Sequence, residues 1–588
     1  MKRTMFRLLP IAAITSMLWA CGGSNNTSPT SSASTATPAS SPAPSTPAGM
    51  TLLVSRGTYD PGFVVTGALP ISPAVNAVSP GTFPNVFTND SVDANFGVTA
   101  DLSIDQWAPN ATSPSLYLDV TAAASATGQT VSTSFSSKSE GALNVSQDGT
   151  AITFNDYYSP IDQIDRSNSN TPGVVDSTNT DVATPTYRAV VQLNLADKSL
   201  QVTRTNAYSG NNGRASVLAG GQYYIVGNAG NSGKTVTYGG LDMLTADTGV
   251  QTIAAGSTCP FTQPIGAFVS GNSSTYTPAP AGTACPTSTT ANTLPAIMGT
   301  ITDSLSATTY SKSNTGGNQF GFSLAQISGQ NYDKTGKDDN FRGLFLGPDG
   351  TLYVSKGSGG NGVNTVYQVG ATGALANGGK LPQNAAITIV PGFTPSGWSG
   401  APAATNLAPT TTQWTLSEGV AYPFGMWIPK SNPNLMFVAD EGDTTAIASA
   451  AIGSGGLWVY QKSSSGTWTA IAHLTQGLNL GQPYTVADAN GTYGTAGASY
   501  TTTPDGLRNI TGQVNADGSL TIYAITSTVG NSLGTTFDEG SDSNQLVKIT
   551  VNVNGSTVTP TGSGFSVMQT APFGQVLRGV ALIPTTSN

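Results

Sequence analysis

A pair of short apolar strands joined by a tight turn recurs along this chain, and it restricts the fold more than any other feature. The pairs cover residues 141–154, 214–226, 342–354, 424–438 and 508–523. Three of the turns contain Asp-Gly, at 148–149, 349–350 and 517–518, and this dipeptide accepts the backbone geometry of a hairpin turn. The pattern therefore predicts an all-β fold built from repeated hairpins.

Each hairpin is followed by a second pair of apolar runs, such as 456–460 with 468–472 and 545–551 with 565–568. Four strands per repeat are typical of a blade of a β-propeller. The repeats recur at wider intervals than the ~40–50 residues of ordinary blades, so long loops are expected. We expect six four-stranded blades, and the wide gap that contains Cys259 and Cys285 leaves room for a seventh.

The two ends of the chain fit the same scheme. Residues 578–583 resemble a first strand with no second strand after it, and residues 51–56 resemble a second strand with no first strand before it. Together they would close the ring with strands from both termini and leave no open edge. A pair of β-sandwiches would have similar turn spacing, but it would not explain the matching unpaired strands.

The segment Pro-Asp-Gly-Thr-Leu-Tyr-Val at 348–354, with weaker copies in other repeats, resembles the blades of NHL, SMP-30 and gluconolactonase-type propellers. The resemblance covers the hairpins of several blades, and it implies the propeller fold. Lactonases, lyases, esterases and pure binding proteins all share that fold, so the resemblance implies no single activity.

The N-terminus has the composition of a secretory signal. Lys2, Arg3 and Arg7 precede an apolar run over 8–20 that is too short for a stable membrane span. The sequence Leu-Trp-Ala-Cys-Gly at 18–22 resembles the lipobox of bacterial lipoproteins. That resemblance implies removal of residues 1–20 as a signal peptide and fatty acylation, such as palmitoylation, of Cys21. The alternative is an ordinary secretory signal with a coincidental cysteine.

Residues 21–49 follow as a lipidated cysteine and a Ser/Thr/Pro/Ala tether that cannot bury a core, and residues 50–588 form the propeller domain. Two or three acyl chains would anchor the protein stably to a membrane. Gly22 stands where an aspartate would retain a lipoprotein in the inner membrane, so the lipobox resemblance favours the outer membrane. The expected location is the cell envelope, with the domain either periplasmic or surface-exposed.

Charge and cysteine content exclude several classes of function. Charged residues make up 9% of the chain, and its net charge is −9, so nucleic acid is not an expected partner. In an oxidising compartment Cys259 and Cys285 are expected to form a disulfide. The single histidine, His473, lies in an apolar run and is expected to be packed, so sites for zinc, copper or haem are not expected.

In a propeller, the loops that lead into the first strands and those that join second to third strands meet on one face around the axis, and residues from every blade converge there. Arg214, Arg342, Arg508 and Arg578 occupy equivalent positions in these loops. They either line a polar central pocket or pair with neighbouring blades and hold the ring closed. Further candidate ligand-binding residues occur in single repeats only: Lys138, Asp338, Asp339, Tyr422 and Asp505.

Acidic residues cluster in loops after second strands, where short-spaced oxygen ligands suit a hard cation such as calcium. The candidate metal ligands are Asp440, Glu441, Asp443, Asp538 and Asp542. A third acidic stretch spans 156–165. No EF-hand pattern is present, and acidic loops on an acidic protein are often simply solvated.

These observations favour a binding or interaction module, held outside the cytoplasm by a lipid anchor, that requires no cofactor. Its partner would be a surface protein, a glycan or a small molecule. The alternative is a propeller hydrolase or lactonase, calcium-dependent or not, with Glu140, Glu418 and Asp440 as candidate catalytic carboxylates. Glu140 and Glu418 occur in matching Ser-Glu-Gly steps. A structural component of the envelope without a ligand is a third hypothesis.

Overall fold

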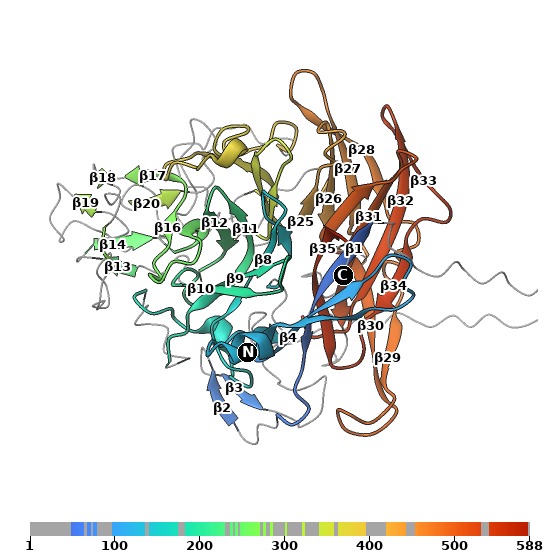
Figure 1. The fold of residues 1–588 in the computed structure, drawn as a ribbon, viewed down its shortest axis with the longest axis horizontal. Helices are drawn as coiled ribbons and strands as arrows, with labels where there is room; N and C mark the ends of the chain where they lie inside the picture. Colours follow the sequence, from blue (N-terminus) through green and yellow to red (C-terminus); the bar gives the residue numbers. More distant parts are fainter. Residues whose placement is uncertain are drawn as a thin grey trace, which may run out of the picture. The chain divides into compact units, whose positions relative to one another are not determined.

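A computed structural model describes the following parts of the chain: residues 49–63, 68–71, 75–78, 97–135, 140–174, 182, 184–229, 236–238, 241–244, 247–270, 275–277, 283–285, 300–302, 320–323, 340–357, 363–394, 419–442, 453–530 and 540–585. Strands dominate these residues, and they form six antiparallel sheets that stack around a ring as the blades of a β-propeller (Figure 1). The all-β propeller expected from the sequence is confirmed, and the two-sandwich alternative is wrong.

Strands of the N-terminal half of the chain form three blades, with β35 added from the C-terminal end, and the strands of each blade are named from the axis outward. Blade 1 contains β35 (Gln575–Pro584), β1 (Met50–Thr58), β4 (Val98–Trp107) and β5 (Ser115–Asp119). Blade 2 contains β7 (Asn144–Val145), β8 (Ala151–Tyr157), β9 (Arg188–Asn194) and β10 (Leu200–Thr205). Blade 3 contains β11 (Gly213–Ala219), β12 (Gln222–Gly227), β15 (Gly249–Ala254) and β16 (Gln263–Pro264).

The other three blades follow in chain order. Blade 4 contains β21 (Gly343–Leu346), β22 (Leu352–Lys356), β23 (Thr365–Val369) and β24 (Ile387–Ile389). Blade 5 contains β25 (Pro423–Trp427), β26 (Leu435–Asp440), β27 (Gly456–Lys462) and β28 (Trp468–Leu474). Blade 6 contains β30 (Ala498–Val514), β31 (Leu520–Gly530), β32 (Gln545–Asn554) and β33 (Thr557–Pro560), with β29 (Tyr484–Asp488) paired to β30 and β34 (Ser566–Thr570) paired to β32.

The remaining described elements lie between or beside the blades. Strand β6 (Thr133–Phe135) pairs with β4, and β2 (Ala68–Ile71) pairs with β3 (Val75–Val78). One short helix, α1 (Val120–Ala126), follows β5, and the 3₁₀ helices are η1 (Arg166–Asn168) and η4 (Ala376–Gly378). Among the described residues, no helix has the length and apolar character needed to cross a membrane.

The two ends of the domain meet in blade 1, as the unpaired terminal strands predict. Strand β1 pairs antiparallel with β35, in a register that places Leu52 opposite Leu582 and Val54 opposite Val580. Figure 1 shows these strands side by side although they come from opposite ends of the chain. This pairing closes the ring because it supplies the innermost strand of blade 1 from the C-terminus.

The innermost strands contact one another in a closed cycle of six: β35, β7, β11, β21, β25, β30 and back to β35. Because β11 contacts β21 directly, the wide gap between blades 3 and 4 does not hold a seventh blade. The described strands of that gap form a separate sheet and a hairpin. The sheet contains β13 (Val236–Tyr238), β14 (Leu241–Leu244), β20 (Phe320–Ser323) and β17 (Ala267–Ser270), and the hairpin contains β18 (Thr275–Thr277) and β19 (Thr300–Thr302).

A separate apolar cluster fills the interface between every two neighbouring blades. Ile152 and Leu53 contribute to the interface of blades 1 and 2, for example, and Phe437 and Ile522 to that of blades 5 and 6. The remaining four interfaces have clusters of the same kind. Successive residues of a strand alternate between these interfaces, and this is why second strands such as β22 are buried on both faces.

Neighbouring inner strands approach so closely that only small residues fit between them. A Cβ atom on Gly343 would lie 2.0 Å from the carbonyl oxygen of Phe424, and one on Gly579 would lie 2.3 Å from that of Gly141. Ala142 forms a backbone bridge with Ala215 between blades 2 and 3. At these contacts the small residue therefore sets the distance between its blade and the next, whereas in blade 6 the side-chain amide of Asn509 bonds to the carbonyl of Arg578 at 2.6 Å.

The Asp-Gly hairpins form where the sequence predicts them, although only the glycine adopts a positive φ: Gly149 (74°), Gly350 (83°) and Gly518 (84°). The aspartate instead accepts hydrogen bonds from the residue two positions on. Asp349, for example, accepts from the backbone N–H of Thr351 at 3.0 Å and from its hydroxyl at 2.9 Å. The side chain thus replaces backbone turn contacts, as in an Asx turn.

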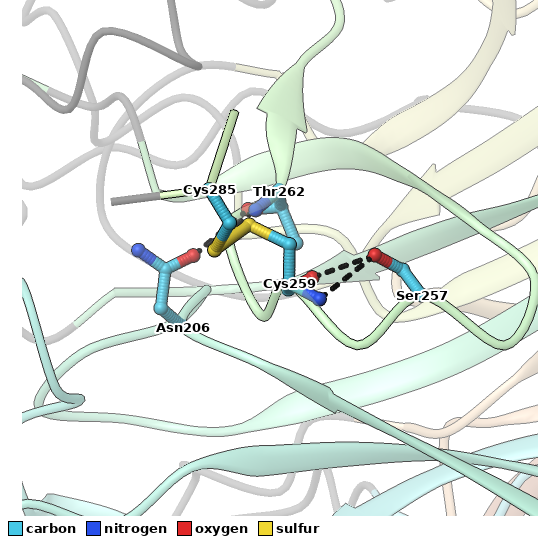
Figure 2. The surroundings of a disulfide bond; sticks show 5 residues. All are labelled: Asn206, Ser257, Cys259, Thr262 and Cys285. Atoms are coloured by element: carbon cyan, nitrogen blue, oxygen red, sulfur yellow. Dashed lines mark hydrogen bonds between the residues drawn. A yellow bond between two sulfur atoms is a disulfide. The ribbon is translucent and has the colours of Figure 1, made fainter. Parts of the chain in front are cut away.

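The predicted disulfide between Cys259 and Cys285 is confirmed, with Cα atoms 5.5 Å apart. It joins residues of the wide gap to the segment that follows β15 (Figure 2). Beside it, Asn206 accepts a hydrogen bond from the N–H of Thr262 at 3.1 Å, and Ser257 bonds the backbone of Cys259. The disulfide therefore fastens the gap segment to blade 3, next to the end of blade 2.

The close contact between inner strands predicts a large effect of one added methyl group. Gly343→Ala is expected to lower the free energy of unfolding by about 1–3 kcal/mol or more, because the new Cβ collides with the backbone of blade 5. Gly62→Ala is the control, since Gly62 is exposed and its nearest neighbour is the end of the Asp60 side chain. Urea unfolding of both variants checks this, and equal midpoints would contradict it.

Candidate functional site

Four arginines, which we call the axial arginines, occupy one register position of the inner strands. Each immediately precedes the residue that packs against the neighbouring blade, which is Ala215, Gly343, Asn509 or Gly579; the axial arginines are Arg214, Arg342, Arg508 and Arg578. Phe424 holds the same position in blade 5, and Gly141 holds it in blade 2. Because the inner strands surround the axis, the four arginines of four different blades lie around one central region.

The charges of the axial arginines interact from blade to blade across the centre of the ring. The positive charge of Arg342 lowers the pKa of Arg214 on one side and of Arg508 on the other, in each case after the larger effect of burial. Arg214 also interacts with Glu140 of blade 2 and Glu441 of blade 5. The axial arginines and these two glutamates therefore form one cluster.

Two of the axial arginines bond to a neighbouring blade, and Arg578 bonds to β6, which pairs with β4 of its own blade. Arg214 donates to the carbonyl of Phe341 at 2.9 Å and to the side chain of Asn340. Arg508 donates to Glu441 at 3.2 Å, and Arg578 donates to the carbonyl of Ser134 at 3.0 Å. The bonds of Arg214 and Arg508 support the interpretation that these side chains hold neighbouring blades together.

Burial differs among the axial arginines. Arg214, Arg508 and Arg578 are buried, with 2%, 5% and 3% of their surface exposed, whereas Arg342 is only half-buried. Burial lowers the pKa of Arg508 to about 10 and that of Arg214 well below its usual value. Tyr422 is half-buried as well. Among the sequence-predicted ligand contacts that the structure describes, Arg342 and Tyr422 therefore remain accessible to solvent.

Blade 2 contributes acidic groups where other blades contribute arginine. A Cβ atom on Gly141 would lie 3.0 Å from the Cβ of Arg578, so the absence of a side chain there leaves space for the stem of that arginine. Glu140, which precedes Gly141, accepts a hydrogen bond from the hydroxyl of Tyr157. Asp156 lies beside Glu140 and Arg578, and burial, followed by the charge of Glu140, raises its pKa well above the usual range.

Sequence reasoning did not single out Tyr157 and Arg188, and it noted Asp156 only as part of an acidic stretch. All three lie at facing ends of β8 and β9, where Tyr157 pairs with Arg188 in the strand register. The Arg188 guanidinium is buried and donates to the carbonyls of Asn211 and Thr186 at 2.9 and 2.7 Å. The sequence does show charged residues at the facing ends of these two strands. Such a pattern does not show how deeply their side chains are buried.

The acidic residues expected to bind calcium have other contacts in the structure. Asp440 accepts hydrogen bonds from the backbone N–H groups of Ala421, Tyr422 and Gly442 at 2.8, 3.3 and 3.1 Å, while Glu441 pairs with Arg508. Asp542 is buried. Within the described part of the chain, no three His, Cys, Asp or Glu side chains gather closely enough to hold a metal ion.

Several other predicted residues can be placed, and some cannot. Asp505 is buried in blade 6 and accepts the N–H of Gly453 at 2.6 Å. His473 stacks on Trp458 on the outer strands of blade 5, with ring centroids 4.1 Å apart, and so lies away from the axial cluster. The predicted residues that lie outside the described parts of the chain are Cys21, Lys138, Asp338, Asp339, Glu418, Asp443 and Asp538.

No family model and no curated protein matches this chain. Among solved structures, it is similar to the hemagglutinin-neuraminidase of parainfluenza virus 5, crystallised with the ligand DANA. The similarity covers 82% of this chain and 84% of that chain, at 12% sequence identity and a TM-score of 0.23. A similarity this low supports no argument about function, so the function has to be inferred from the site itself.

Buried carboxyl groups with raised pKa values predict a pH-dependent stability. Burial raises the pKa of Asp247 to about 7 and that of Asp440 to about 6, whereas both groups ionise near pH 4 in the unfolded chain. The folded protein therefore binds more protons across this range, and its free energy of unfolding falls as pH rises from about 4 to 7. The slope is about 1.4 kcal/mol per pH unit for each such group.

Urea unfolding at pH 5 and pH 8 measures this effect, with the higher midpoint expected at pH 5. Asp247→Asn is expected to raise stability at pH 8 and to reduce the pH dependence, because asparagine mimics the protonated form. Asp197→Asn, in an exposed turn, is the control and should leave the slope unchanged. A higher midpoint at pH 8 in the wild type would contradict the prediction.

Proposed function

We propose that this protein is an extracytoplasmic binding module that takes an anionic ligand at the axial arginines of its propeller. One observation carries the proposal: four blades present arginine at the same axial position in a chain whose net charge is −9. Within the cluster, the four axial arginines face the two glutamates Glu140 and Glu441 and the carboxyl group of Asp156, whose pKa burial raises well above its usual range. The centre is therefore locally cationic in an acidic protein.

The chemistry of these side chains supports this choice of ligand. A guanidinium group presents five N–H donors in a planar fork that fits a carboxylate, phosphate or sulfate. The Nε atoms of Arg214 and Arg578 are buried, and neither has a hydrogen-bond partner among the described residues. The bonds that these arginines make thus leave donors of the cluster unused, and Arg342 and Tyr422 are themselves partly exposed to solvent. An anion would satisfy those donors.

A hydrolase that uses Glu140, Glu418 and Asp440 is less well supported. The oxygens of Asp440 already accept three backbone N–H groups, which fits a role in shaping the loop around Tyr422. Glu140 is bonded to Tyr157, and both side chains are buried. We therefore favour binding over catalysis.

The location belongs to the same proposal. We infer that Cys21 carries the lipid anchor, that residues 22–49 act as a tether, and that the propeller works in the cell envelope, attached to the outer membrane. The lipobox resemblance supports this inference, and so does the Cys259–Cys285 disulfide, since disulfides persist in oxidising compartments.

Arg342→Gln is expected to weaken anion binding about tenfold, because a hydrogen bond to a charged group contributes about 1.5–3 kcal/mol. Thermal shifts with sulfate and D-glucuronate measure this, against sodium chloride at equal ionic strength. Arg204→Gln is the control with the same charge change. Arg204 is exposed on β10, where it lies over the rings of Tyr158 and Tyr187. Stabilisation no larger than with sodium chloride would refute anion binding.

Cys21→Ser is expected to abolish incorporation of a labelled fatty acid and to release the protein from the membrane fraction, because serine provides no thiol for acylation. Metabolic labelling and fractionation of expressing cells provide the measurement. Cys285→Ser, which removes a cysteine of the disulfide instead, should leave the label in place. Membrane attachment of Cys21→Ser would show that the anchor lies elsewhere.

A further inference from the structure

Blade 2 breaks the pattern of the axial cluster. The segment that leads into its inner strand has Gly141 where four other blades have arginine, and this glycine leaves room for the stem of Arg578 from blade 1. In place of an arginine, blade 2 contributes Glu140 and Asp156. One side of the cationic cluster is therefore acidic.

Asp156 is the unusual member of this acidic side. It is buried, with 2% of its surface exposed, and neither carboxyl oxygen has a hydrogen-bond partner among the described residues. Thr133 lies close enough to favour the ionised form, yet no hydrogen bond of normal geometry joins the two side chains. A buried carboxyl group without a partner costs free energy, and a bound group that hydrogen-bonds to it would remove that cost.

The neighbours of Asp156 determine which group would fit. Glu140 lies close enough to disfavour a second negative charge, and its effect raises the pKa of Asp156. Arg578 and Arg188 supply positive charge on the same side, which disfavours a metal ion or an ammonium group. A hydroxyl group avoids both conflicts, because it is neutral and can donate to one carboxyl oxygen while it accepts from a protonated one.

We infer that the ligand is a hydroxylated organic anion, such as a sugar acid, whose anionic group binds the axial arginines while an adjacent hydroxyl bonds to Asp156. Arg578 connects the two halves of this site. Its Nε is buried without a partner among the described residues, and its charge interacts with both Asp156 and Glu140. The inference rests on the proposed anion binding and adds the class of ligand.

Three probes separate the two halves of the site in titrations of the full-length chain. D-glucuronate has a carboxylate and ring hydroxyls, cyclohexanecarboxylate has the carboxylate on a ring without hydroxyls, and D-glucose has the hydroxyls without the carboxylate. D-glucuronate is expected to bind at least about tenfold more tightly than cyclohexanecarboxylate, because an analogue without hydroxyls leaves Asp156 unpaired. D-glucose should bind more weakly than either acid.

Variants at Asp156 assign the preference to this residue. Asp156→Ala should bring the affinity for D-glucuronate down to that for cyclohexanecarboxylate, and Asp156→Asn should keep part of the preference because an amide also bonds to a hydroxyl. Asp247→Asn removes another buried carboxylate, beside Ser209 and outside the axial cluster, and should leave the preference unchanged.

Thermal stability provides a second readout. Asp156→Asn is expected to raise the melting temperature, because it removes a buried carboxyl group that has no partner among the described residues and lies beside Glu140. If Asp156 had only a structural role, its substitution by asparagine would lower the melting temperature. That result would overturn the inference, and it can be obtained even where ligand binding is too weak to titrate.

The outcomes distinguish the inference from the proposed function. Equal affinities for D-glucuronate and cyclohexanecarboxylate, or a preference that survives Asp156→Ala, would overturn the hydroxyl site and leave anion binding standing. Failure of both acids and of sulfate to bind would remove the proposed function and the inference together. Tight binding of D-glucose alone would likewise overturn both.

Discussion

The rest of this structure depends on the contact between backbones of neighbouring inner strands. Gly343, Gly425 and Gly579 each face a carbonyl oxygen of the next blade at a distance that no side chain could occupy. Ser55 and Ser355 reinforce two of these contacts, since each hydroxyl accepts from a glycine N–H of its own blade and donates to a carbonyl of the next. Six such contacts in a cycle determine how tightly the sheets close around the axis.

This contact has a consequence for the residue that precedes it. An arginine one position before this contact lies close to its counterparts from other blades, and three of the four are buried. Burying a guanidinium group is costly unless its donors are bonded. Carbonyl oxygens of Phe341 and Ser134 and the carboxylate of Glu441 offset part of that cost, and the bonds to Phe341 and Glu441 also join neighbouring blades. Structural and ligand-binding roles are therefore not exclusive for these arginines.

Departures from the repeat are more informative about function than the repeat itself. The arginine position recurs in four blades, whereas the glycine at 141 and the carboxyl group of Asp156 occur in one. Only an asymmetric centre can fix the orientation of a ligand, because a uniform ring of arginines would bind an anion in several equivalent ways. Blade 2 provides that asymmetry by combining Glu140, Asp156 and Tyr157 beside Arg578.

The sequence by itself determined the hairpins, the closure by both termini and the shared position of the axial arginines, because each depends on local turn chemistry, strand alternation or a repeated pattern. It also indicated the disulfide, because Cys259 and Cys285 are the two cysteines outside the signal region. It left the blade number open, and direct contact between β11 and β21 settled it at six. Only the tertiary structure brought Asp156 and Tyr157 to the axial arginines, and Arg188 to Tyr157 and Glu140. These residues lie on second and third strands, and their burial depends on how neighbouring blades pack, a long-range property that no local sequence pattern encodes.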